Sequence, residues 1–127
     1  MPIRSPVDGA PPLGWDDRAV LALSHVYGAA LAATAEPADA ADVTQQVMVA
    51  AAGDRADTRT LVARAVLRAM RTAPHAAFAC MAPSEREVVA LARLAGYTVP
   101  EIAATLGIEP AEARARMTRA LRAAAVT

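Results

Sequence analysis

The chain has 127 residues, including 35 alanines and 13 arginines but no lysine, and its formal net charge is zero. This length fits one domain or two very small ones, and a hydrophobic fraction of 55% excludes a disordered, charge-rich chain. Zero net charge argues against nucleic-acid binding over the whole surface, although residues 58–80 and 113–127 each carry four arginines and no acid.

The composition predicts an all-α fold. Alanine and leucine are the best helix formers, and the residues that favour sheets are sparse. A single cysteine cannot form an internal disulfide, and the first residues lack the apolar core of a signal peptide. The most apolar stretch, residues 19–35, is too short and too rich in alanine for a membrane span. We therefore expect a cytoplasmic protein that makes no use of a membrane.

Breaker and capping residues place three helices in the first half. Residues 1–15 contain four of the nine prolines, so they are expected to form a flexible lead segment. The first helix covers about 17–33, and its expected apolar stripe consists of Val20, Leu23, Tyr27, Ala30 and Leu31. Asp39 is the expected N-cap of a second helix that runs through about residue 52, and a third covers about 58–71.

Two capping boxes are predicted in the C-terminal third. In each, a hydroxyl side chain and a glutamate three residues later satisfy backbone N–H groups at the start of a helix. Ser84 and Glu87 open a helix that closes at Gly96, and Thr98 and Glu101 open the next one. A last helix is expected from residue 110 to about residue 124.

The spacing of the last two helices indicates a helix-turn-helix. Gly107, Ile108 and Glu109 form the turn, Ala103 is small where the helices cross, and Pro110 suits the first helical turn. A simple helical hairpin shows the same features and is the alternative interpretation.

These elements divide the chain into four segments. They are a flexible N-terminal segment (1–15), a helical domain (16–73), a short connector (74–83) and a helix-turn-helix domain (84–127). A connector of roughly ten residues can hardly hold two halves far apart. We therefore expect the halves to pack together into one compact helical unit.

Several motifs together point to one family. Residues 84–91 (SEREVVAL), 96–98, 101–103 and 106–108, followed by the arginine-alanine tail 113–120, resemble region 4 of the extracytoplasmic-function (ECF) sigma factors. Response regulators of the LuxR type share the first part, but the tail fits the sigma version better. Tyr27-Gly28 and the segment 39–48 resemble sigma region 2. The resemblance covers roughly residues 19–124 and implies a short, divergent member with region 2-like helices followed by a region 4-like helix-turn-helix.

The last helix carries the DNA contacts that its resemblance to a recognition helix implies. Helical spacing gives it a buried face of Ala113, Met117, Ala120, Leu121 and Ala124. The expected DNA-binding residues are Glu112, Arg114, Ala115, Arg116, Arg119 and Arg122. A glutamate can accept a hydrogen bond from cytosine and an alanine can touch a thymine methyl, whereas the arginines would mainly hold phosphates. The alternative is a solvated arginine face on a packed helix.

Two further surfaces are predicted in the N-terminal half. Arg64, Arg68 and Arg71 recur on one face of the third helix and form a second basic patch. This segment lacks the aromatic platforms that hold unpaired bases, so autonomous promoter melting is not expected. The resemblance to region 2 implies a surface for polymerase or another partner, formed by Asp39, Asp42, Gln45, Gln46 and Met48. Alternatively, the two aspartates only supply negative charge to the first helical turn.

Enzymatic chemistry is not expected. His25, His75 and Cys80 are scattered, and two neighbouring candidate ligands do not make a zinc site. The sequence contains no glycine-rich phosphate loop, no paired carboxylates and no nucleophile elbow. We therefore predict no catalytic residue, no metal and no cofactor.

The sequence thus predicts an ECF sigma factor-like transcription regulator whose partners are core RNA polymerase and promoter DNA, bound weakly or atypically. An anti-sigma protein, another protein partner and a second copy of the chain are further candidate partners. The alternative is a sigma-derived helical interaction module, dimeric in one form, that no longer binds DNA. A stand-alone helix-turn-helix regulator, which would need to dimerise for specificity, is a third hypothesis.

Overall fold

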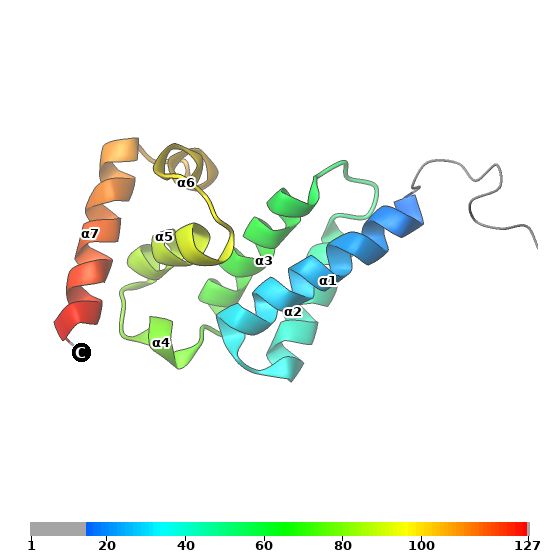
Figure 1. Cartoon of the computed structure of the whole chain (residues 1–127), viewed down its shortest axis with the longest axis horizontal. Helices are drawn as coiled ribbons and strands as arrows, with labels where there is room; N and C mark the ends of the chain where they lie inside the picture. The colour runs from blue at the N-terminus through cyan, green and yellow to red at the C-terminus, as the bar shows by residue number, and fades with distance from the viewer. Residues whose placement is uncertain (1–14, 127) are drawn as a thin grey trace, which may run out of the picture.

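The computed structural model describes residues 15–126, which form seven α-helices and no strand, so the all-α fold is confirmed. In chain order the helices are α1 (Trp15–Thr34), α2 (Pro37–Ala50), α3 (Thr58–Thr72), α4 (Ala76–Ala79), α5 (Pro83–Leu94), α6 (Val99–Leu106) and α7 (Pro110–Val126). The first three form one bundle, and α5, α6 and α7 lie on the other side of α3 (Figure 1). The segment 1–15, expected to be flexible, lies outside the described residues apart from Trp15. None of the described helices is both long and apolar enough to cross a membrane.

Small residues bring α1 close to α2 and α3. The buried face of α1 consists of Ala22, Val26, Ala30 and Ala33. The expected stripe was therefore partly wrong, because Val20 and Leu23 are 67% and 46% exposed. Alanine methyl groups let helix axes approach closely, so the alanine-rich face of α1 is the one that packs against both neighbours, and the larger side chains are left at its edges.

The start of α2 differs from the prediction. Pro37 occupies the first turn and Glu36 is the N-cap, with no side-chain hydrogen bond at this end. The fixed φ of proline suits the first helical turn, so the helix begins two residues before the expected N-cap. Asp39 consequently lies inside the first turn, where its negative charge is favourable near the positive end of the helix dipole.

The connector contains the short helix α4, which the sequence analysis did not predict. His75 is its N-cap, and the His75 Nδ1 atom accepts a hydrogen bond of 2.8 Å from the backbone of Ala77. The backbone N–H of His75 also donates to the carbonyl of Ala33, which ties the connector to the end of α1. The thiol of Cys80 is exposed and contacts the Ala77 carbonyl. Among the described residues, no three His, Cys, Asp or Glu side chains are grouped so that they could hold a metal ion.

The predicted capping box of Ser84 and Glu87 is wrong. α5 begins at Pro83, its N-cap is Ala82, and this end has no side-chain cap. Because proline favours the first helical position and holds the preceding residue extended, Ala82 becomes the N-cap and Ser84 falls inside the helix. Glu87 instead forms an ion pair of 2.9 Å with Arg71 of α3.

One hydrophobic core joins the two halves. Its fully buried members include Val26 of α1, Val66 of α3, Leu91 of α5 and Ile102 of α6. The packing of α3 against α5 is the main contact between the halves (Figure 1). A second, smaller cluster of Met81, Val89 and Ala120 holds α7 against α5. The two halves therefore form one packed unit, as the short connector leads one to expect.

Replacing Leu91 with alanine tests this shared core. The side chain is fully buried, so its truncation is expected to lower the free energy of unfolding by about 2–5 kcal/mol. Because both halves contribute to one core, the wild type and the variant should each unfold in one cooperative transition in urea, followed by far-UV circular dichroism. Leu121→Ala is the control, since that side chain is 59% exposed and its loss should change stability by no more than about 0.5 kcal/mol. Two separate transitions in the wild type would contradict the prediction.

Candidate nucleic-acid interface

Capping interactions build the helix-turn-helix from the sequence upward. The Thr98–Glu101 capping box at the start of α6 is confirmed: the Glu101 carboxylate accepts from the Thr98 backbone at 2.9 Å, and the Thr98 hydroxyl accepts from the Glu101 backbone at 3.4 Å. Gly107 ends α6 with φ at 68°, a conformation that glycine adopts without penalty. The Ile108 N–H donates to the Ala103 carbonyl at 3.0 Å. The chain then enters α7 at Pro110, as predicted.

The inner face of α7 follows the expected spacing only in part. Ala113 and Ala120 are fully buried, and Met117 packs partly against the core. Leu121 was expected on this face but is 59% exposed, and Ala124 is also exposed. Both belong to the last turns of α7, beyond the buried Ala120.

The outer face of α7 carries the predicted DNA-binding residues. Arg114, Arg119 and Arg122 are exposed, whereas Glu112, Ala115 and Arg116 are half-buried. Within the described part of the chain, no carboxylate pairs with Arg114 or Arg122. The helix therefore presents cationic side chains along much of its solvent-facing length.

One carboxylate on this face engages two of the arginines. Oε1 of Glu112 accepts hydrogen bonds from Nε of Arg116 at 3.0 Å and from the guanidinium of Arg119 at 3.4 Å. The Arg116 hydrogen bond is the largest cause that lowers the pKa of Glu112 below its ordinary value. Glu112 is therefore anionic at neutral pH and reduces the positive charge that α7 presents.

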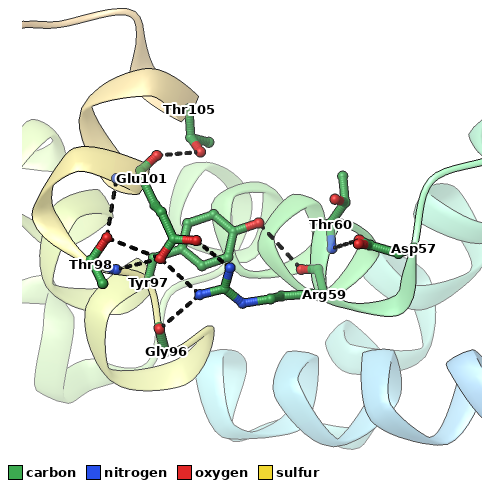
Figure 2. Close-up of polar contacts among 8 residues, drawn as sticks. All are labelled: Asp57, Arg59, Thr60, Gly96, Tyr97, Thr98, Glu101 and Thr105. Carbon is green, nitrogen blue, oxygen red and sulfur yellow. Dashed lines mark hydrogen bonds and ion pairs between the residues drawn. The ribbon is translucent and has the colours of Figure 1, made fainter.

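A second polar cluster fastens α6 to α3 (Figure 2). The Arg59 guanidinium forms a two-pronged ion pair with the Glu101 carboxylate, and it donates to the carbonyl of Gly96 at 3.1 Å. The same group lies over the Tyr97 ring, 4.5 Å from its centroid, a cation–π arrangement. Arg59 and the backbone of Thr98 together lower the pKa of Glu101 to about 2. The cluster thus joins the first helix of the helix-turn-helix to the N-terminal bundle.

Sequence reasoning did not single out Arg59. Glu101 and Tyr97 were recognised as parts of local motifs, but their common partner lies about forty residues earlier in the chain. Spacing along one helix carries no information about such a contact. The sequence does carry one weak signal, because Arg59 stands at the start of a predicted helix. The helix dipole does not favour a cation there, so a carboxylate from another element is expected to pair with it.

The second basic patch is occupied by neighbouring polar groups. Arg64 pairs with Asp54 at 3.0 Å, Arg71 pairs with Glu87 at 2.9 Å, and Arg68 donates to the side chain of Gln46. The three arginines lie along a groove of about 350 Å³ between α2 and α3. Carboxylates thus partly neutralise the charges of Arg64 and Arg71, unlike those of Arg114 and Arg122, whereas Arg68 meets a neutral amide.

The residues expected to face polymerase do not lie on one surface. Asp42, Gln45 and Gln46 are exposed on α2, and Asp39 is half-buried. Met48 is half-buried, packs partly against the core and lines a groove of about 860 Å³ with Leu21 and the α2–α3 loop. Val49, which the sequence analysis did not select, follows Gln45 by one helical turn and is 68% exposed.

Comparison with known families supports the interpretation of this half of the molecule. Residues 75–123 match the family model of sigma-70, region 4. The match covers the C-terminal part of the chain, where the motifs of the sequence resemble ECF region 4, and supports that resemblance. Region 4 is a non-enzymatic domain of transcription factors that bind RNA polymerase and promoter DNA in general. No curated protein and no solved structure matches the chain.

The contribution of Glu101 to stability is expected to depend on pH. Its pKa is about 2 in the folded chain, against an ordinary value of 4.5, so its ion pair stabilises the fold above about pH 4.5 and is lost as the pH falls toward 2. Glu101→Gln keeps the capping geometry, since glutamine serves at this position too, but it removes the charge. The variant should therefore unfold at lower urea than the wild type near pH 7, with a gap that narrows below about pH 4.5.

Glu109→Gln is the matched control for this comparison. Glu109 is exposed and forms no ion pair within the described residues. The difference in urea stability between the wild type and Glu109→Gln should therefore be small and should not narrow below about pH 4.5. A wild-type–Glu101→Gln gap that is unchanged between about pH 7 and pH 3 would show that the Arg59–Glu101 pair does not stabilise the fold.

Proposed function

We propose that the chain is a cytoplasmic transcription regulator of the ECF sigma type. It holds DNA through α7 and binds core RNA polymerase, and its two halves act as one packed unit. The observation that carries the proposal is the arginine-bearing outer face of α7. This helix is the second of a helix-turn-helix whose first helix, α6, begins with a complete capping box, and both lie within the region 4 match. A helix in this position can enter the major groove, and its exposed guanidinium groups suit phosphate oxygens.

The composition of α7 favours contacts to the DNA backbone over the reading of bases. A recognition helix reads bases mainly with its N-terminal residues, and here these are Ala111, Glu112 and Ala115. The alanine side chains have no hydrogen-bonding group, and the Glu112 carboxylate already accepts from two arginines, which leaves these N-terminal residues little capacity for hydrogen bonds to base edges. We therefore infer modest sequence selectivity, with most of the affinity coming from Arg114, Arg119 and Arg122 against phosphates.

A polymerase-facing role is proposed for the exposed face of α2. Asp42, Gln45 and Val49 share this face and have no other helix over them. Gln46 is a weaker candidate because Arg68 already binds its side chain, and Met48 is excluded from the proposed surface by its packing against the core. The polar and apolar character of the remaining three residues is compatible with a protein partner.

Packing of the two halves limits how the proposed regulator reaches DNA. Because one core and the Arg59–Glu101 ion pair hold the helix-turn-helix against the N-terminal bundle, the two halves are not expected to contact widely separated promoter elements. We therefore propose contact with one DNA element at a time through α7.

A second candidate is a sigma-derived interaction module that has lost DNA binding. The observation in its favour is a cluster of large aliphatic side chains near the start of α1, where Val20, Leu21 and Leu23 are 67%, 52% and 46% exposed. Exposed aliphatic surface of this kind suits a protein partner such as an anti-sigma protein or a second copy of the chain.

Removing two arginines from α7 tests the proposed DNA contact. The double substitution Arg114→Ala and Arg122→Ala is expected to weaken binding to duplex DNA and to reduce the slope of log K against log salt by about 2, or roughly one per lost phosphate contact. Fluorescence anisotropy at several salt concentrations measures both quantities. Arg55→Ala removes an exposed arginine from the α2–α3 loop, far from α7 (Figure 1), and should leave binding unchanged. Equal affinity and slope for the double variant and the wild type would reject α7 as the contact.

Binding to polymerase is tested by competition. The folded chain should be retained by immobilised core RNA polymerase and displaced by a bona fide sigma factor. The double substitution Asp42→Arg and Gln45→Ala is expected to reduce retention about tenfold or more, because a charge reversal at an interface removes a favourable contact and adds a repulsive one. The Arg55→Ala variant should be retained like the wild type. Absence of retention by the folded wild type would favour the interaction module.

A further inference from the structure

We propose that Glu112 is a positioning residue that orients Arg116 and Arg119 on the outer face of α7 and makes DNA binding more selective at the expense of affinity. This inference rests on the proposed DNA-binding function and names the residue that sets the selectivity of that site. Two hydrogen bonds converge on one carboxylate oxygen of Glu112 and divide the four arginines of α7 into two classes.

The hydrogen bond to Arg116 constrains the direction of its guanidinium. Glu112 accepts from Nε of Arg116 at 3.0 Å, so the two terminal nitrogen atoms of this arginine are not used by the pair. A guanidinium is planar, and fixing Nε therefore sets the plane in which the terminal nitrogens can meet a base edge or a phosphate. The Arg116 side chain is only 24% exposed, and this partial burial restricts its alternative rotamers.

Arg119 is held more loosely by the same oxygen atom. Its contact with Glu112 is 3.4 Å long, and its side chain is 51% exposed. A phosphate can therefore compete for Arg119 with little rearrangement, while Arg116 stays oriented. A side chain that is already ordered loses less conformational entropy on binding, so the oriented arginine favours a DNA geometry that matches it over one that does not.

Arg114 and Arg122 form the second class. They are exposed, and within the described residues no carboxylate orients them. Their side chains can therefore contact the phosphates of a duplex of any sequence. Glu112 also carries a negative charge toward the DNA, which lowers affinity for all duplexes alike. The structure therefore separates two effects of Glu112, namely orientation, which acts on selectivity, and charge, which acts on affinity.

Three substitutions separate these effects. Glu112→Gln removes the charge and weakens the orientation of both arginines. Glu112→Asp keeps the charge near the helix start, but its shorter side chain cannot reach both arginines in the same way. Glu109→Gln is the matched control, because it removes a negative charge from the turn before α7 without breaking an ion pair of the described structure.

The measurement uses the full-length chain and duplexes selected from a pool with a randomised central segment. Affinity is then measured by anisotropy for the selected duplex and for a scrambled duplex of the same composition. Glu109→Gln should tighten binding to both duplexes equally. Glu112→Gln and Glu112→Asp should each lower the ratio of selected to scrambled affinity by about fivefold or more, the lower end of what one base contact discriminates. Circular dichroism verifies that the variants retain the helical content of the wild type.

The outcomes distinguish this proposal from the proposed function. If the Glu112 variants keep the wild-type ratio, Glu112 acts only as a charge and the positioning role is rejected while DNA binding stands. The Nε–Hε NMR signal of Arg116 in the free protein provides an independent readout, and an unchanged signal in Glu112→Gln would equally reject the orienting contact. If the wild type binds DNA but enriches no sequence, the positioning role is rejected as well. If the wild type binds no duplex, the proposed DNA-binding function fails, and this inference fails with it.

Discussion

The packing of α3 against α5 is the constraint on which the rest of the molecule depends. Both helices contribute fully buried side chains, such as Val66 and Leu91, to one core, and α7 is attached mainly through α5 and α6. The contact between α3 and α5 therefore sets how α7 is placed relative to the N-terminal bundle. The ion pair Arg71–Glu87 joins α3 to α5, and Arg59–Glu101 joins α3 to α6. Both arginines are exposed to solvent, so each pair adds modestly to the stability that the core supplies.

Pairing decides which arginines are available to a partner. The sequence contains two stretches with four arginines each and no acid, but they have different consequences in the fold. Those of α3 are bound by Asp54, Gln46 and Glu87, whereas two of the four on α7 have no carboxylate partner within the described residues. The arginine content of a stretch therefore does not show by itself whether the stretch can bind an anion. That depends on where the carboxylates of the folded chain lie.

Sequence reasoning succeeded where the signal is local and failed where it depends on neighbours. The Thr98–Glu101 capping box and the Gly107 turn involve residues a few positions apart, and both are confirmed. The capping box at Ser84 was wrong because Pro83 imposed its own helix start. The buried face of α1 was misjudged because alanines allowed closer packing than the larger side chains. The Arg59 cluster could not be found from spacing, since its members come from different helices.

The weak electrostatics and the rigid packing of this chain support each other in the proposed function. A net charge of zero and a carboxylate among the arginines of α7 make an isolated encounter with DNA unfavourable relative to a strongly basic domain. A rigid body that also binds polymerase through α2 would bring α7 to DNA at a high effective concentration, because the second contact becomes intramolecular. The modest contacts between α7 and DNA would then suffice when the chain is bound to polymerase, and they would be too weak when it is free. The same packing that prevents the two halves from separating would therefore make DNA binding conditional on the partner.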